Sequence, residues 1–258
     1  MNDKQIGVVG GMGSYAAIDL IRKIYDATDA SCDQEHLPVA MLSAPHLTVD
    51  RSQFLSGEIK INPALSISKI ITQLAELGST VVGIPCNTAH APLILDEVQR
   101  TIPEHVQLIH LIEEVAKLIV AQYPSVTEVG VLGTIGTVNS QVYTQIMNRY
   151  GINVLQPPED IQSLFVSPAI YDKNYGIKSH SSPVQVRARN DLLLASRFLS
   201  RKGAQAIVLG CTEIPLAITE EQLETSIVID ATKVLAQAMV RAANRQPVVR
   251  NGSIAQIS

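Results

Sequence analysis

Short runs of β-branched and aliphatic residues alternate along the chain with longer segments of helical period. The short runs predict β-strands at residues 5–10, 37–42, 80–85, 106–110, 128–133, 152–155, 205–210 and 227–229. The segment that begins at Ser14 is typical of an amphipathic helix, because its apolar residues share one face: Ala17, Leu20, Ile21 and Ile24. Strands that alternate with helices in this way favour parallel sheets covered by helices on both faces.

The second half of the chain repeats the first. The strand and glycine turn at 6–13 (IGVVGGMG) return at 129–136 (VGVLGTIG), and a strand that ends in cysteine occurs at 81–88 and again at 206–212. A third strand, followed by a helix, occurs at 106–110 and again at 226–230. Gly10 lies 76 residues before Cys86, and Gly133 lies 78 residues before Cys211. The spacing predicts two similar α/β domains, each with a four-stranded parallel sheet, related by a pseudo-two-fold axis.

The two repeated cysteines fall at the carboxyl ends of predicted strands. Open parallel sheets bind ligands at this end of their strands. If a pseudo-two-fold axis relates the halves, their equivalent edges meet across one cleft. We therefore expect Cys86 and Cys211 to face each other in a cleft between the domains, one thiol from each half.

Composition and charge narrow the function classes. The chain has 258 residues, 46% of them hydrophobic, and a formal net charge of −4, with no run of basic residues. This argues against binding to nucleic acid or to an anionic membrane. The start, MNDKQIGVVGG, lacks the features of a secretory signal, and no apolar run approaches the roughly 18 residues of a spanning helix. We expect a soluble cytoplasmic protein whose polar tail, residues 245–258, is mobile.

The chain contains three cysteines and no C-x-x-C pair, so neither a disulfide framework nor a zinc or other metal site is expected. Cys32 has no counterpart in the repeat, and we interpret it as a small buried hydrophobe. Cys86 precedes Asn87 and Thr88, which favour helix N-caps. A helix N-terminus there would lower the thiol pKa and receive carboxylates. Cys211-Thr212-Glu213 has the same form, so the same lowering is expected for Cys211.

Two facing thiols suit acid/base chemistry at carbon. A thiolate removes a proton from one face, and a thiol returns a proton to the other, so the configuration inverts. His90 could pair with Cys86 four residues earlier, but the second half has Pro215 at the equivalent place. We therefore expect His90 to have a structural role.

Four motifs resemble the aspartate/glutamate racemase superfamily, most closely its aspartate racemases that work without PLP. They are Gly10-Gly-Met-Gly13, Cys86-Asn-Thr-Ala-His90, Gly133-Thr-Ile-Gly-Thr137 and Gly210-Cys-Thr-Glu-Ile-Pro-Leu216. The resemblance implies homodimers and a two-cysteine mechanism without a cofactor. It also implies that the C-terminal segment packs back on the first domain, which gives domains of 1–110 plus 214–258 and of 111–213.

The same resemblance suggests contacts to a small acidic amino-acid substrate. Val49-Asp50-Arg51 is similar to a Pro-Asp-Arg element of the family, and Tyr175-Gly-Ile-Lys178 to a Gly-Ile-Lys element. Arg51 would hold one carboxylate and Lys178 would be a second cation, as an amino acid with two carboxylates requires. The remaining candidate contacts, for several of which helix capping is the alternative, are Met12, Gly13, Asn87, Thr88, Thr134, Thr137 and Thr212.

Other functions explain the sequence less well. The segment 11–16 (GMGSYA) fits the G-x-G-x-x-A dinucleotide motif, but the second strand ends without the acidic residue that a NAD(P)H site requires. A non-catalytic binding protein gives no reason for mirrored cysteines, and paired thiols make a PLP Schiff base on Lys178 unnecessary. Glutamate racemase, hydantoin racemase, maleate isomerase and arylmalonate decarboxylase are nearer alternatives. The prediction is interconversion of L- and D-aspartate.

Overall fold

The first half of the chain forms a parallel sheet of four strands. The computed structural model describes residues 4–244, so the tail predicted to be mobile, residues 245–258, lies outside the described residues. The strands are β1 (Gln5–Gly10), β2 (Val39–Ser43), β3 (Ser79–Gly83) and β4 (Gln107–Ile109). Their order across the sheet is β2-β1-β3-β4, with every neighbouring pair parallel.

The second half forms a sheet with the same order of parallel strands. Its strands are β5 (Glu128–Gly133), β6 (Asn153–Leu155), β7 (Ala206–Gly210), β8 (Gln222–Leu223) and β9 (Ser226–Asp230). The order β6-β5-β7-β9 repeats that of the first sheet, and β8 is added on β9 as an antiparallel edge strand. The sheet therefore has five strands and not the four predicted, because the chain turns back at Glu224 (φ 51°) and pairs Leu223 with Ser226.

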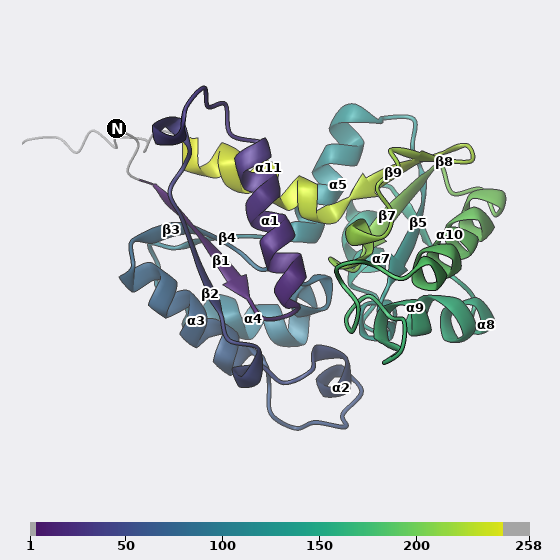
Figure 1. The fold of residues 1–258 in the computed structure, drawn as a ribbon, viewed down its shortest axis with the longest axis horizontal. Helices are drawn as coiled ribbons and strands as arrows, with labels where there is room; N and C mark the ends of the chain where they lie inside the picture. The colour runs from purple at the N-terminus through teal and green to yellow at the C-terminus, as the bar shows by residue number, and fades with distance from the viewer. Residues whose placement is uncertain (1–3, 245–258) are drawn as a thin grey trace, which may run out of the picture.

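All eight predicted strands are present, with ends within two residues of the predicted ones. Helices cover the sheets as the alternating pattern predicts (Figure 1). They are α1 (Ser14–Asp26), α2 (Arg51–Leu55), α3 (Ala64–Glu76), α4 (Pro92–Thr101), α5 (Leu111–Gln122), α6 (Ile135–Asn139), α7 (Val142–Arg149), α8 (Glu159–Ile161), α9 (Ser167–Tyr171), α10 (Val186–Arg201) and α11 (Ala231–Asn244). One face of the first sheet packs on α3 and α4, and the opposite face packs on α1 and α11.

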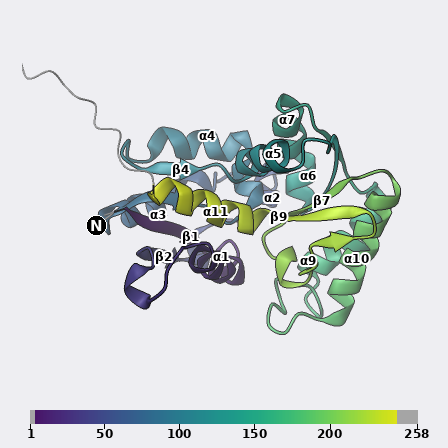
Figure 2. The same cartoon turned by 90° about the horizontal axis from the view of Figure 1, so that it is seen from above.

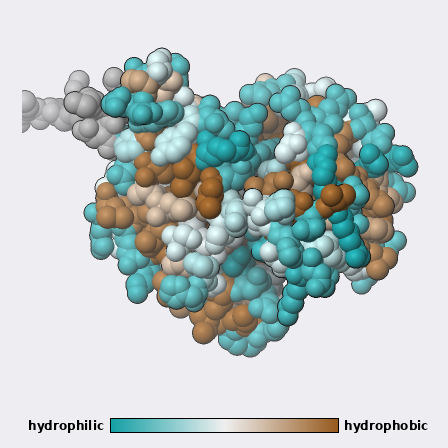
Figure 3. Space-filling model, in the orientation of Figure 1, coloured by the Kyte–Doolittle hydropathy of each residue, from teal (hydrophilic) through white to brown (hydrophobic). Residues whose placement is uncertain are grey.

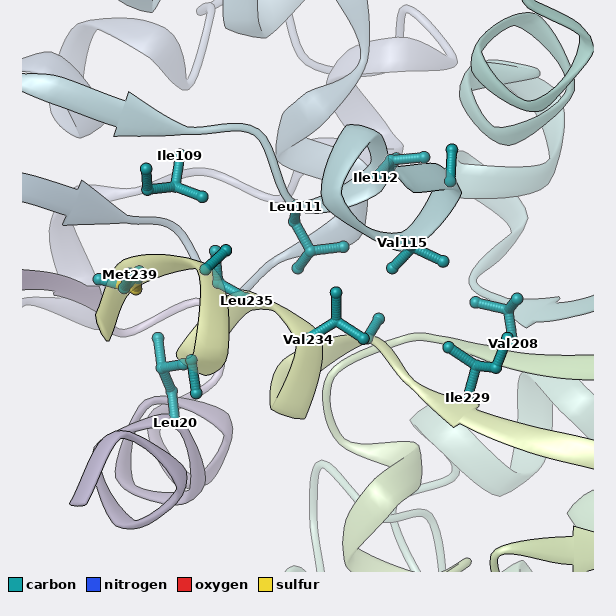
Figure 4. Packing of buried hydrophobic residues seen from close by; sticks show 14 of the residues in the cluster. Leu20, Ile109, Leu111, Ile112, Val115, Val208, Ile229, Val234, Leu235 and Met239 are labelled. Carbon is teal, nitrogen blue, oxygen red and sulfur yellow. The ribbon is translucent and has the colours of Figure 1, made fainter. Parts of the chain in front are cut away.

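One apolar core runs from the first sheet to the second. It joins Val8 and Val81 of the first sheet to Val131 and Val208 of the second, through buried residues of α5 and α11. In Figure 4, Leu235 and Met239 of α11 lie near Ile109 and Leu20, while Val234 points toward Val208 and Ile229. Figure 2 shows α11 lying along the first sheet and continuing directly from β9. The two domains therefore share their largest buried cluster.

The path of the chain at this junction corrects the predicted domain boundary. Residues 226–230 were assigned to the first domain, but they form β9, which pairs in parallel with β7 of the second sheet. The return to the first domain begins only with α11, at Ala231. The reason is that the apolar run 227–229 supplies the strand that the second sheet needs beside β7, before the chain becomes helical.

A buried lysine ties α1 to this junction. Lys23 pairs with Asp19 on its own helix and with Asp230 at the end of β9, at 2.5 Å for the second pair. Asp230 also accepts hydrogen bonds from the backbone N–H groups of Thr232 (2.8 Å) and Lys233 (3.0 Å), so it caps α11. Lys23 therefore neutralises the carboxylate that starts the crossing helix.

The surface carries hydrophilic residues over both domains, interrupted by small apolar groups on the face shown in Figure 3. Among residues 4–244 no helix combines the length and the apolar character that crossing a bilayer requires. The strands β3 and β7, which end just before Cys86 and Cys211, belong to different sheets, so a site that uses both cysteines has to lie between the two sheets.

Replacement of Lys23 by Met should destabilise the protein by about 3–5 kcal/mol, because the buried carboxylate of Asp19 and the partly buried carboxylate of Asp230 would lose their shared cation. Arg22→Met is the matched control: Arg22 binds the same Asp19, at 2.9 Å, but its side chain is 64% exposed. We expect that control to cost at most about 1 kcal/mol. Urea unfolding followed by circular dichroism measures both changes, and equal losses would contradict the role given to Lys23.

Candidate active site

A narrow pocket lies between the two domains and holds both repeated cysteines. The side chains that line it lie close together, so the space between them is small. The first domain contributes Met12, Arg51, Ser52, Cys86, Asn87 and Thr88. The second contributes Thr134, Tyr171, Lys178, Cys211, Thr212 and Glu213.

Most of the candidate contact residues lie in this pocket, and two lie directly behind its wall. Gly13 does not line it, but a side chain at Gly13 would collide with the carboxylate of Glu213. Thr137 is buried and its hydroxyl contacts the hydroxyls of Thr88, at 2.8 Å, and Thr134, at 3.1 Å. Gly13 therefore leaves room for a pocket side chain, and Thr137 supports two others.

The backbone holds Cys86 at the point where the strand β3 gives way to a short 3-10 turn, 87–90. His90 donates from Nδ1 to the carbonyl oxygen of Cys86 at 2.9 Å. Burial and the charge of His110 lower the pKa of His90 to about 3, so its ring is neutral near pH 7. This contact holds the ring of His90 on the backbone of Cys86, and its structural role stays a prediction.

Cys211 lies beside a carboxylate that the sequence analysis did not single out. Its thiol donates a hydrogen bond to Oε2 of Glu213 at 3.0 Å, and the other carboxylate oxygen of Glu213 pairs with Lys178. Burial raises the pKa of the Cys211 thiol well above its ordinary value, and the negative charge of Glu213 raises it further.

The expectation of a lowered thiol pKa is therefore wrong for Cys211. The residues after each cysteine form 3-10 turns of three or four residues, and not α-helices that begin at the thiol. The N-terminal effect of a longer helix is absent at both positions. At Cys211 the nearest charge is, in addition, negative.

Glu213 and Lys178 form a buried ion pair. Burial alone would raise the pKa of Glu213, but the Lys178 charge and the hydrogen bonds from Lys178 and Cys211 lower it below its usual range. Burial would likewise lower the pKa of Lys178, but the charge of Glu213 outweighs that effect and raises it. Both groups are thus ionised near pH 7.

Arg51 lines the same pocket as Cys86. Asp50 caps α2 by accepting from the backbone N–H of Gln53 at 3.0 Å, which fixes Arg51 as the first residue of that helix. Burial would lower the pKa of Arg51, but the acidic groups around it, Cys86 and Asp50 foremost, keep it above the ordinary value. The buried Nε of Arg51 has no hydrogen-bond partner in the protein.

Hydrogen bonds cross between the domains around the pocket. The hydroxyl of Thr212 donates to the carbonyl oxygen of Pro85 at 2.9 Å, and Thr88 and Thr134 share a hydrogen bond of 3.0 Å. The buried hydroxyl of Tyr143 donates to Oδ1 of Asn87 at 2.7 Å. This contact leaves the buried amide nitrogen of Asn87 without a protein partner.

Sequence reasoning missed four residues of this site. Glu213 could have been found from the sequence, because it is a charged residue in an otherwise apolar motif. It stands two residues after Cys211, where the first half has Thr88 two residues after Cys86. No sequence pattern indicates the other three, Ser52, Tyr171 and Tyr143. The hydroxyl oxygens of Ser52 and Tyr171, for example, lie 3.5 Å apart although 119 residues separate them along the chain. Their roles depend on tertiary packing.

Cys32 differs from its prediction too. It is exposed and not buried, because it lies in the loop between α1 and β2, directly before a 3-10 turn, and is not part of the hydrophobic core. Among the residues that the structure describes, no group of three or more His, Cys, Asp or Glu side chains could hold a metal ion.

Known proteins share this fold and sequence pattern. Residues 9–239 match the family model of Asp/Glu/Hydantoin racemases. The broad specificity amino-acid racemase RacX of Bacillus subtilis is 24% identical over 249 residues, which cover 91% of this chain and 96% of RacX.

Solved structures agree with the assignment. The aspartate racemase of Picrophilus torridus is 28% identical, with a TM-score of 0.77 over 94% of this chain and 95% of its own. A glutamate racemase from Francisella tularensis, solved with D-glutamate, shares the fold at 18% identity, with a TM-score of 0.63 over 94% and 81% of the two chains. The chain belongs to the Asp/Glu/Hydantoin racemase family and is an isomerase of the racemase type.

Proposed function

We propose that the protein interconverts L- and D-aspartate by proton transfer between two cysteines. The observation that carries the proposal is that Cys86 and Cys211, which follow equivalent strands of the two halves, line one small pocket together with Arg51 and Lys178. The likeness to the Picrophilus aspartate racemase supports aspartate as the substrate.

The reaction requires a base on one face of the α-carbon and an acid on the other. One cysteine, as thiolate, takes the α-proton and becomes a thiol, while the carbon holds the electron pair. The second cysteine, as thiol, donates its proton to the opposite face and becomes a thiolate. The substrate leaves with inverted configuration and an unchanged number of protons, so the chemistry requires no further reactant.

Two unpartnered donors are placed to hold a carboxylate. The Nε of Arg51 and the amide nitrogen of Asn87 are buried and make no hydrogen bond within the protein. Buried donors without partners are costly, and a carboxylate would satisfy both while its charge is neutralised by the guanidinium. Neutralising the carboxylate next to the α-carbon also stabilises the negative charge that develops when the proton leaves.

The opposite end of the pocket offers charges of both signs. Lys178 would contact the second carboxylate of aspartate, and Glu213 would accept hydrogen bonds from the α-ammonium group.

A racemase of broader substrate range is the second candidate. The observation that favours it is the ion pair of Lys178 with Glu213, which already neutralises the cation that a second carboxylate would use. RacX, described as a broad specificity amino-acid racemase, fits the same reading. Comparison of aspartate with glutamate, alanine and lysine as substrates decides between the two candidates.

Incubation of the protein with L-aspartate in D2O should yield D-aspartate that carries deuterium at the α-carbon. Cys86→Ala and Cys211→Ala should each reduce kcat by at least about 10²-fold, because either change removes the acid or the base on one face. Chiral chromatography with mass detection measures both products. Cys32→Ala is the control, since Cys32 is exposed and outside the pocket. Absence of deuterium and of D-aspartate in the wild type would sink the assignment.

Arg51→Gln should lower kcat/KM for aspartate by about 10- to 150-fold, which corresponds to the loss of a hydrogen bond to a charged group. Initial rates at a series of aspartate concentrations give the value. Arg100→Gln is the matched control, because the Arg100 side chain is 72% exposed and outside the pocket. If Arg51→Gln retained full kcat/KM, the carboxylate would bind elsewhere.

Tyr143→Phe should raise KM by about 2- to 12-fold and change kcat little, because the Asn87 amide would lose the hydrogen bond that directs its N–H groups toward the substrate. The control is Tyr150→Phe, which removes a hydroxyl bonded to Glu113 at 2.6 Å, away from the pocket. A KM equal to that of the wild type would show that Tyr143 does not orient Asn87.

A further inference from the structure

Arg51 reaches the pocket on a segment that the first domain holds by few buried contacts. This segment, residues 44–62, connects β2 with α3 and carries α2, and none of its residues is fully buried. Its partly buried side chains Phe54 and Leu55 pack on the apolar cluster of the first sheet. Figure 1 shows α2 outside the helices that cover this sheet. The position of Arg51 therefore depends on what else holds α2.

The other domain makes a second contact with α2. The helix packs on α6, the short helix that follows β5 in the second domain. At this contact Ser52 lies directly against Gly136. A β-carbon added to Gly136 would lie only 2.8 Å from the Cα and the Cβ of Ser52, and closer still to the Ser52 hydroxyl oxygen. Ser52 therefore occupies the space that a side chain at position 136 would need.

The backbone conformation does not require glycine at position 136. Gly136 is the second residue of α6, and its φ lies outside the positive region that favours glycine. In a helix of ordinary geometry alanine is favoured over glycine, because glycine loses more conformational freedom on folding. The close approach of Ser52 supplies the physical reason for the glycine.

A pair of hydroxyl groups joins the same segment to the second domain. The hydroxyl oxygens of Ser52 and Tyr171 lie 3.5 Å apart, at the outer limit of a hydrogen bond, and both side chains line the pocket. Tyr171 ends α9, and its ring centroid lies 5.9 Å from the Nζ of Lys178. Ser52, which follows Arg51 in the chain, thus meets the second domain at two points.

We propose that Gly136 is a positioning residue: Ser52 docks on it across the domain boundary, and this docking places Arg51 in the pocket. The inference rests on the proposed function, in which Arg51 holds a substrate carboxylate. It adds the part of the second domain that keeps Arg51 in place. The guanidinium donates from Nη1 to the carbonyl oxygen of Val49 at 3.2 Å, within the same segment, so it moves with α2.

A methyl group at position 136 would be accommodated by movement of α2 and not of α6. The residues on either side of the contact in α6, Thr134 and Thr137, are buried and their hydroxyls bond to each other and to Thr88. No residue of α2 is fully buried. The collision would therefore shift α2, and a shift of about 1 Å in a positioned group can cost about 10²-fold in rate.

Gly136→Ala should lower kcat/KM for aspartate by about 10- to 100-fold, because the added methyl group displaces Arg51. Arg51→Gln shows whether the loss passes through Arg51. Gly136→Ala added to Arg51→Gln should cause less than about a threefold further loss, since the group through which Gly136 acts is already removed. Initial rates at a series of aspartate concentrations measure the wild type, both single variants and the double variant. Two full and independent losses would overturn the inference.

Ser52→Gly tests the docking itself. It removes the Cβ and the hydroxyl oxygen of Ser52, two of the three atoms that the new methyl group would meet. Alone it should lower kcat/KM by about 2- to 12-fold, through loss of the hydroxyl contact with Tyr171. Added to Gly136→Ala, it should bring kcat/KM back to within about threefold of the Ser52→Gly value.

Ser56→Gly is the matched control for this rescue. Ser56 lies on the same segment, but it is exposed and outside the pocket, so Ser56→Gly should recover none of the activity that Gly136→Ala loses. A purely structural role of Gly136 within α6 would not depend on the side chain at position 52. Losses that multiply in the variant with both Gly136→Ala and Ser52→Gly would therefore contradict the docking.

If Gly136→Ala did not fold, Ser52→Val would crowd the same contact from the side of α2, where no residue is fully buried. Ser52→Val should then lower kcat/KM by more than Ser52→Gly does, because it adds a collision to the loss of the hydroxyl. Ser56→Val is its control. Equal kcat/KM values for Ser52→Val and Ser52→Gly would show that the space at Gly136 is not limiting.

Hydrogen exchange of residues 50–56, followed by mass spectrometry and corrected for the intrinsic rate of each sequence, requires no substrate. These amides should exchange at least about tenfold faster in Gly136→Ala than in the wild type, because α2 loses its packing on α6, and Ser52→Gly in the same chain should reverse the change. Faster exchange in a protein that fails to racemise aspartate would leave the docking standing and remove the proposed substrate. Racemisation by the wild type, with unchanged exchange in Gly136→Ala, would support the proposed function and remove the inference.

Discussion

The continuous apolar core that α5 and α11 build between the two sheets is the constraint on which the site depends. Two separate α/β domains joined by a linker would move relative to each other. Here the residues of α11 pack on the first sheet at one end and near β9 of the second sheet at the other (Figure 4). The carboxyl ends of β3 and β7 are thereby held at a fixed separation, as the proposed proton transfer between two thiols requires.

Polar contacts then set the details at the seam. Threonine hydroxyls and the Tyr143–Asn87 hydrogen bond join the halves directly around the pocket. The same contacts leave the buried amide nitrogen of Asn87 without a hydrogen-bond partner in the protein. The charges in the pocket do not follow the repeat of the two halves. They depend on single residues, such as Glu213, that have no charged counterpart in the other half.

Local sequence pattern and internal repetition were enough to predict the sheets and the position of the two cysteines. Each strand can be recognised from its own run of apolar residues. The internal repeat then shows which glycine turn and which cysteine of one half correspond to those of the other, and this requires only the sequence. The edge strand β8 has only two residues and therefore no period to detect. The predicted boundary at 214 failed for a related reason, because membership of a sheet is decided by which strand a segment pairs with.

The site was harder to predict, because its electrostatics arise between distant parts of the chain. Lys178 and Glu213 are 35 residues apart and Asn87 and Tyr143 are 56 apart, so neither contact has a local signature. The residues after Cys211 were interpreted as the start of a helix that would acidify the thiol. The structure instead gives a short 3-10 turn at 214–216, and the residue that precedes this turn, Glu213, accepts a hydrogen bond from the sulfur.

The matching strand order of the two halves has a consequence for how such a protein could arise. One half alone carries one of the paired thiols, so a half-length ancestor could have formed this pocket only by associating with a second copy of itself. In such a symmetric pair every residue appears twice, and both thiols would have had identical neighbours. Joining the copies into one chain allowed the residue two places after each cysteine to diverge, to Thr88 in one half and Glu213 in the other. Gene fusion is in this sense what permits the same amino acid, in the same structural position, to have an uncharged neighbour in one half and a charged neighbour in the other.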